Sequence, residues 1–410
     1  MARLRRQPAG NRFSTVSPEL FESFEPNERF RQRRAQARRR RQYRRRAAIG
    51  ALALLLVAVA AMAIGATVIH NDSSKSPAKA APKTETTKAV QRRPVPQEMR
   101  GVHVTPALAS DSTKLAEYLA IPGLNTLQVD VKDENGEVGF LMPNTALARK
   151  VGATKPYYKA GQVAGKARAA GVYLIGRIVT FEDPILSQQR PDLAIRRADG
   201  SVWTNSAGLG WTNPYDKRVW DYNIEIGKAA AAHGFDEIQF DYVRFPSDGD
   251  VENTVYRGKV NEDMGWTIAR FVQYAAKQLK PLGVRVSVDM FGLAATHNLG
   301  IGQVPRRVAR FVDAIYPMVY PSHYSPGEFN LPDPSASPGT TVAASLRDYR
   351  RHMRGTKAQL IPWLEDFSLG RTRTVDEVRA QIEAARSSQT RGFLLWNPSG
   401  VYTQEVLRRP

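Results

Sequence analysis

The chain has 410 residues, 42% of them hydrophobic and 24% charged, which is ordinary globular composition and excludes both wholesale disorder and a multispan membrane protein. The absence of cysteine excludes a disulfide scaffold, thiolate catalysis and a cysteine-ligated zinc site. The formal net charge of +20 would point to nucleic acid if it covered one face, so its distribution along the chain decides its meaning.

The basic excess is concentrated at the N-terminus. Residues 1–46 contain fifteen arginines and four glutamates, a net charge of +11, and ten of these arginines lie between Arg31 and Arg46. The remaining residues carry only +9. Because the arginine run contains a single aromatic residue, Tyr43, we expect anionic lipid headgroups rather than nucleic acid as its partner.

An uninterrupted apolar segment follows this tail. Residues 47–69 contain no charged side chain, and as a helix they would be roughly 34 Å long, enough to cross a hydrocarbon core of about 30 Å. Arginines at 44–46 precede the segment, so the positive-inside rule places the tail, residues 1–46, in the cytoplasm. We predict a single transmembrane helix over 47–69, with membrane lipids as partners and the C-terminal part outside the cell membrane.

A cleaved signal peptide is the alternative interpretation, because residues 78–80 resemble a small-residue cleavage site. The apolar run is longer than the roughly 7–15 residues of a signal h-region, which favours an anchor. The following stretch, residues 71–97, is rich in Pro, Ser, Thr and Lys and has too few large apolar side chains to bury a core. We therefore predict a flexible linker over residues 70–98 and a folded domain over 99–410.

The folded domain alternates short β-branched runs with amphipathic helical stretches, which is typical of βα units around a parallel sheet. Eight runs are expected as strands: 101–105, 126–131, 172–179, 237–243, 284–290, 314–320, 360–365 and 392–396. Seven stretches are expected as helices: 112–120, 159–170, 217–233, 263–280, 304–312, 342–353 and 375–387.

Eight such units predict an α/β fold, the (β/α)₈ TIM barrel. An open, doubly wound sheet is the alternative. It is disfavoured because no glycine-rich phosphate-binding motif follows the first strand.

A barrel of this kind carries its chemistry at the C-terminal ends of its strands. Four expected strands carry polar residues towards those ends, at Asp130, Arg177, Asp241 and Asp289. Side chains alternate along a strand, so these residues should point into the barrel mouth. A carboxylate within an apolar run is costly unless it is paired or hydrogen-bonded.

Two interpretations of the pair Asp241 and Asp289 remain open. Each carboxylate could be structural, capping the next helix or pairing with Arg177 or Arg244. The two residues lie on adjacent expected strands, and the alternation of side chains points both to the same face of the sheet, which favours a functional pair. Paired carboxylates are what glycosidic cleavage requires, one as nucleophile or base and the other as proton donor.

Segments from most strand ends carry a family resemblance, which covers about residues 100–398. The segments are RGVHVT (100–105), VDVKDENGEVGF (129–140), GRIVTFEDP (176–184), WTNPYDKRVWDYN (211–223), GFDEIQFDYVRFPSDG (234–249), VDMFG (288–292), YPMVYPSHYSPGEF (316–329) and PWLEDF (362–367). Together they resemble the putative glycosyl hydrolase domain family, extracytoplasmic barrels grouped with α-amylase-like and α-galactosidase-like retaining enzymes.

The resemblance implies roles for three carboxylates. Asp241 stands where related barrels place the nucleophile, and Asp289 stands where amylase-like enzymes place the acid/base, although those enzymes usually have Glu. Asp366 matches a transition-state-stabilising carboxylate after the seventh strand. Its neighbour Glu365 is an alternative proton donor, but the family commonly has Gln at this position.

Aromatic side chains near the same loops could stack on sugar rings, although packing beneath long loops is the commoner role of such residues. The candidates are Trp203, Trp211, Tyr320, Tyr324 and Trp396, of which Tyr320 and Trp396 end strands. We expect substrate binding by Tyr320 and Trp396, together with Asp130, Arg177, Arg244 and His103.

No motif of a zincin or of a serine hydrolase with a nucleophile elbow occurs in the sequence. Of the six histidines only His103 and His323 fall near strand ends. A metal site built from His103 and Asp130 is an alternative, but a histidine that hydrogen-bonds a neighbouring carboxylate is the simpler interpretation. We therefore expect no cofactor and no metal.

These observations predict a membrane-anchored glycoside hydrolase with a polysaccharide or oligosaccharide substrate, extracellular or from the cell wall. A non-catalytic carbohydrate-binding barrel on the cell surface is the main alternative. A third hypothesis makes the arginine-rich tail the functional part, with the barrel as a scaffold.

Overall fold

The computed structural model describes residues 92–143, 146–258 and 262–408. The predicted tail, the predicted transmembrane helix and the linker up to residue 91 lie outside these residues. Among the helices that are described, none combines the length and the apolar character needed to cross a membrane.

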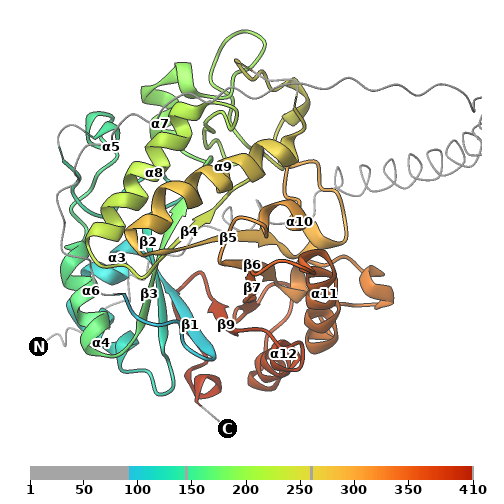
Figure 1. Cartoon of the computed structure of the whole chain (residues 1–410). Helices are drawn as coiled ribbons and strands as arrows, with labels where there is room; N and C mark the ends of the chain where they lie inside the picture. Colours follow the sequence, from blue (N-terminus) through green and yellow to red (C-terminus); the bar gives the residue numbers. More distant parts are fainter. Residues whose placement is uncertain (1–91, 144–145, 259–261, 409–410) are drawn as a thin grey trace, which may run out of the picture.

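The described residues form one closed barrel of parallel strands, as predicted (Figure 1). Strands pair in the order β5-β4-β3-β2-β1-β9-β8-β6-β7, and pairing of β5 with β6 closes the ring. The strands are β1 (Met99–Val104), β2 (Thr126–Lys132), β3 (Tyr173–Val179), β4 (Glu237–Asp241), β5 (Arg285–Phe291), β6 (Ala314–Val319), β7 (Gln359–Leu360), β8 (Trp363–Glu365) and β9 (Gly392–Trp396).

The strand expected over 360–365 is divided into β7 and β8. Both pieces pair with β6, so together they fill one of eight positions in the barrel. Pro362 lies between them and has no N–H to donate to a ladder, which accounts for the interruption.

Helices surround the strands on the outside of the barrel, as the cartoon shows (Figure 1). They are α3 (Pro106–Ser110), α4 (Ser112–Leu119), α5 (Leu147–Lys150), α6 (Ala160–Ala169), α7 (Pro184–Gln189), α8 (Lys217–Ala232), α9 (Met264–Leu279), α10 (Pro305–Val308), α11 (Pro338–Met353) and α12 (Val375–Ser387).

The helix starts follow from local sequence. The carboxylates of Asp216 and Asp263 accept hydrogen bonds from the first turns of α8 and α9. Thr374 and Glu377 form a capping box at the start of α12. Two expected helices differ in extent: α11 begins earlier, at Pro338, whose fixed φ suits a first turn, and α10 ends at Val308 instead of residue 312.

Two hydrophobic clusters form the core. The larger one fills the layer between strands and helices. The smaller one lies inside the barrel and includes Tyr173, Tyr316, Ile361 and Leu394. Within this interior, Glu237 accepts hydrogen bonds from Tyr173 at 3.0 Å and Tyr316 at 2.9 Å, so the buried carboxylate is satisfied.

The chain enters the barrel at the end where the strands begin. Arg92 donates hydrogen bonds to the carbonyls of Ala231 and Phe235, just before β4, and Arg93 donates to that of Val172, just before β3. Residues 92–98, which we assigned to the linker, therefore include side chains held against the domain. The carboxyl ends of the strands lie at the opposite end.

Candidate active site

A cavity of about 140 Å³ opens at the carboxyl ends of the strands. Parallel register helps to explain its composition. Asp130 lies beside Arg177, and Phe240 lies beside Val288, so Asp241 and Asp289 follow at the same level of adjacent strands. Seven of the nine predicted site residues line it: His103, Asp130, Arg177, Asp241, Asp289, Tyr320 and Trp396. Thus both carboxylates of the predicted pair share one cavity.

Asp241 is surrounded by hydrogen-bond donors. Its Oδ2 accepts hydrogen bonds from Nε and Nη2 of Arg177 at 2.9 and 2.8 Å. Its Oδ1 accepts one from the backbone N–H of Tyr242 at 2.6 Å. Tyr242 has φ of +49°, a left-handed conformation that is rare for a bulky residue and occurs mostly at functional sites.

Asp289 has the opposite environment. Its Oδ1 accepts a hydrogen bond from the indole N–H of Trp363 at 2.7 Å. Its Oδ2 is buried and has no hydrogen-bond partner among the described residues. Burial, and next the negative charge of Asp241, raise the pKa of Asp289 well above its ordinary value. Of the two carboxyl groups, Asp289 is therefore the one whose surroundings favour the protonated form, and Asp241 is the one that contacts a positively charged side chain.

Arg177 connects the carboxylates of the site. Its guanidinium forms ion pairs with Asp130 at 2.7 Å, Glu134 at 2.5 Å and Asp241 at 2.8 Å. Burial alone would lower the pKa of Arg177, but the carboxylates outweigh it and raise that pKa, so the side chain stays charged. Three negative partners around one buried guanidinium fix the orientation of each carboxylate.

His103 and Asp130 contact each other in the cavity wall. The Nε2 of His103 lies 3.3 Å from Oδ2 of Asp130, and its Nδ1 lies 2.7 Å from the amide oxygen of Gln128. Although burial acts against ionisation of Asp130, His103 and Arg177 hold its pKa below the usual value. Within the described part of the chain, no group of three or more His, Asp or Glu side chains is arranged to hold a metal ion.

The structure places two predicted site residues outside the cavity. Asp366 turns towards the C-terminal segment, where its carboxylate accepts hydrogen bonds from the N–H and hydroxyl of Thr403 at 2.7 and 2.6 Å. Burial raises the pKa of Asp366 to about 6. Arg244 is buried with its guanidinium 4.8 to 4.9 Å from the ring centres of Trp211, Tyr242 and Phe291.

Of the other aromatic candidates, Trp203 and Trp211 are fully buried and Tyr324 hydrogen-bonds Ser345, so all three pack beneath loops. The cavity residues that the site prediction omitted include Glu134, Trp363 and His323. Trp363 could have been found from its position two residues before Glu365 on the same expected strand. The contact with Asp289, which gives it importance, joins residues 74 positions apart.

The contact between Trp363 and Asp289 yields a prediction. The indole N–H stabilises the charged form of Asp289, so the substitution Trp363→Phe keeps the ring and removes a donor that lowers the pKa of Asp289. We expect that pKa, and with it the alkaline limb of the pH–rate profile, to rise. The profile of kcat/KM against pH measures this.

The matched control is Trp203→Phe, which removes an equally buried indole N–H whose partner is the backbone oxygen of Asp250, outside the cavity. This variant should leave the alkaline limb in place. An alkaline limb that stays unchanged or moves down in Trp363→Phe contradicts the assignment of Asp289.

Comparisons with known proteins identify a family, and one solved structure agrees with the fold. The sequence model of the putative glycosyl hydrolase domain family matches residues 101–402. The PgaB glycoside hydrolase domain from Bordetella bronchiseptica superposes with a TM-score of 0.56 at 12% identity, over 76% of this chain and 99% of that one. A hypothetical protein from Ruminiclostridium thermocellum is 35% identical over 46% of this chain and 96% of its own, with a TM-score of 0.42. No curated protein matches the sequence.

Proposed function

Because the chain belongs to the putative glycosyl hydrolase domain family, we propose that it hydrolyses glycosidic bonds with Asp241 as nucleophile and Asp289 as general acid/base. The observation that carries this proposal is a pair of carboxyl groups in one cavity with opposite surroundings: the Arg177 guanidinium contacts Asp241, whereas burial raises the pKa of Asp289. Such a pair is what glycoside hydrolysis needs.

In the proposed first step, a carboxylate oxygen of Asp241 attacks the anomeric carbon while Asp289 gives its proton to the departing glycosidic oxygen. The glycosyl group is then held as an ester of Asp241. In the second step Asp289, now ionised, takes a proton from water, and the water oxygen displaces Asp241 from the sugar. Arg177 keeps the carboxylate of Asp241 oriented throughout.

The cavity walls suit a carbohydrate substrate. Tyr320, Trp363, Phe367 and Trp396 offer flat apolar faces, against which the C–H faces of a sugar ring can pack. Asp130, Glu134 and Arg177 offer polar groups for its hydroxyls. We propose an extracellular or cell-wall oligosaccharide or polysaccharide as the substrate class.

The test is to incubate the purified full chain with a panel of defined glycans and to measure release of new reducing ends. We expect turnover of at least one glycan, and loss of that turnover when Asp241 is replaced. A glycan that binds in equilibrium dialysis but is never cleaved would contradict the proposal and select a carbohydrate-binding barrel instead.

We also propose that the barrel works on the outer side of a membrane, anchored through residues 47–69. Support comes from the apolar sequence with three arginines before it and from the path of the described chain. Arg92 and Arg93 bring the chain to the end of the barrel opposite the cavity, an arrangement that leaves the cavity open to large glycans.

The sequence contains no cysteine, so a single introduced cysteine can be labelled specifically to test this orientation. In intact cells, Ser201→Cys on the exposed surface of the barrel should react with a membrane-impermeant maleimide, whereas Ser14→Cys in the tail should react only after lysis. The degree of labelling is read by mass spectrometry. Protection of Ser201→Cys in intact cells would overturn the orientation.

A further inference from the structure

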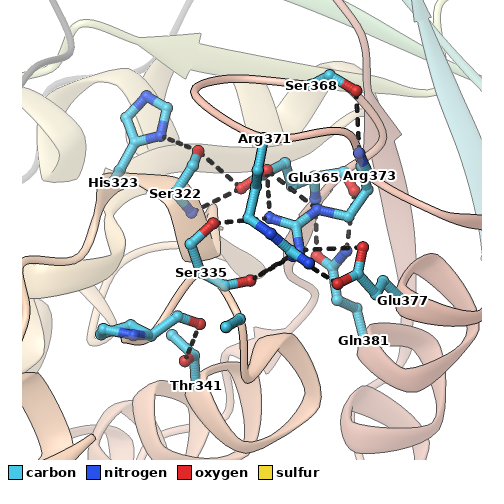
Figure 2. A network of polar contacts seen from close by, with 12 residues as sticks. Ser322, His323, Ser335, Thr341, Glu365, Ser368, Arg371, Arg373, Glu377 and Gln381 are labelled. Carbon is cyan, nitrogen blue, oxygen red and sulfur yellow. Dashed lines mark hydrogen bonds and ion pairs between the residues drawn. The ribbon is translucent and has the colours of Figure 1, made fainter. Parts of the chain in front are cut away.

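A second polar network reaches a histidine that lines the cavity (Figure 2). It runs from Arg373 through Glu365 and Ser322 to His323. The proposed mechanism assigns none of these four residues a role. Glu365 was the alternative proton donor, but it does not line the cavity.

Glu365 is fixed on both carboxylate oxygens. Its Oε1 accepts hydrogen bonds from Nε and Nη2 of Arg373 at 3.2 and 2.6 Å. Its Oε2 accepts them from the N–H and the hydroxyl of Ser322, both at 2.9 Å. Glu365 and Arg373 are only 1% and 2% exposed, and a buried carboxylate with this arrangement serves as a rigid anchor.

The single hydroxyl proton of Ser322 determines the state of the next residue. The hydroxyl oxygen lies 2.9 Å from Oε2 of Glu365 and 3.0 Å from Nδ1 of His323. A carboxylate only accepts, and a hydrogen bond to an ionised acceptor is roughly twice as strong as one to a neutral acceptor. The proton of Ser322 therefore goes to Glu365, and the hydroxyl oxygen must accept a proton from Nδ1 of His323.

His323 itself is a neutral ring. Burial lowers its pKa to about 4, so it carries one proton near neutral pH. The ring packs edge-on against Tyr320 and Phe367, with centre distances of 5.4 and 6.0 Å, and all three residues line the cavity. With the proton on Nδ1, the other nitrogen, Nε2, carries a lone pair and can only accept.

We propose that Glu365 and Ser322 hold His323 in the Nδ1–H tautomer, so that Nε2 accepts a hydrogen bond from a hydroxyl of the bound glycan. His323 is thus a specificity-determining residue, and Ser322, Glu365 and Arg373 are positioning residues. The glycan-binding part of this inference rests on the proposed function, whereas the tautomer does not.

The tautomer is measured on the full chain labelled with ¹⁵N-histidine, without any glycan. Six histidines give few signals, and loss of one set in His323→Gln assigns His323. Two-bond ¹H–¹⁵N spectra should show the proton on Nδ1 in the wild type, and Ser322→Ala should reduce this population. The matched control is Ser335→Ala, which removes another hydroxyl bound to Arg373 and should leave the tautomer unchanged.

The acceptor role is measured on the glycan that the panel identifies. His323→Leu removes the acceptor and should raise KM by roughly three- to tenfold, whereas His323→Gln retains an acceptor oxygen and should raise it less. If the wild type has the proton on Nε2, or if Ser322→Ala leaves the Nδ1–H population unchanged, Ser322 and Glu365 do not position His323.

Equal KM values for the His323→Leu and His323→Gln variants would overturn the acceptor role of His323. If no glycan binds, the proposed function and acceptor role fail together, while the tautomer result stands by itself.

Discussion

Replacing Asp241 by Asn is expected to lower kcat/KM for glycoside hydrolysis by about 10⁴-fold or more, the scale seen when an essential nucleophile is removed. The amide cannot form the glycosyl ester. Folding should survive, because Arg177 keeps ion pairs with Asp130 and Glu134. Initial rates on the glycan found in the panel, together with a thermal unfolding curve, measure both effects.

Asp366→Asn is the matched control for this variant. Asp366 is also a buried carboxylate near the end of a strand, but it lies outside the cavity and contacts Thr403. An Asn side chain can accept from the Thr403 N–H and donate to its hydroxyl, so we expect nearly unchanged kcat/KM. Equal losses in both variants would show that the effect of Asp241→Asn is structural.

Replacing Asp289 by Asn is expected to lower kcat by about 10²- to 10⁴-fold for glycosides with poor leaving groups, because the proton donor is lost. Aryl glycosides whose leaving group needs little protonation should lose much less. The ratio of the two losses is the measurement. It separates loss of a proton donor from loss of a nucleophile, which affects both kinds of substrate.

The dependence of kcat/KM on pH tests whether Asp289 is the proton donor. Burial and Asp241 raise the pKa of Asp289, so the acid form is present below that pKa and disappears as pH rises through it. The wild type should therefore lose kcat/KM on the alkaline side, and Asp289→Asn should have no such limb. An alkaline limb of the same midpoint in the variant would assign it to another group.

The barrel could be predicted because its determinants are local. Strands buried on both faces appear as β-branched runs, and capping residues such as Asp216, Asp263 and Thr374 mark the helix starts. The errors arose where local pattern was ambiguous. Residues 360–364 of the run 360–365 are all apolar, so the hydrophobic pattern did not reveal that Pro362 would divide the run into two strands.

The site residues could be predicted where the alternation of side chains along a strand determines which way each side chain points. Asp241 and Asp289 share the cavity because both lie near the carboxyl ends of their strands, at alternating positions whose side chains point into the barrel. Asp366 and Arg244 follow strand ends, where alternation no longer applies and loop contacts with Thr403 and the aromatic rings determine direction. Trp363, which contacts Asp289, and Glu365, which contacts Ser322 beside His323, both lie on β8. Each is far in sequence from the residue it contacts, so only folding brings them together.

The central claim is that Asp241 forms a covalent bond to the sugar, and trapping that ester tests it most directly. The full chain is incubated with the 2-deoxy-2-fluoro glycosyl fluoride of the sugar that the panel identifies. Asp241 attacks the anomeric carbon, fluoride leaves, and the ester accumulates because the ring fluorine slows its hydrolysis. Intact-mass and peptide mass spectrometry should find one glycosyl group per chain, on Asp241, and none in Asp241→Asn. A label on another carboxylate, or turnover of the glycan with no label at all, would contradict the account.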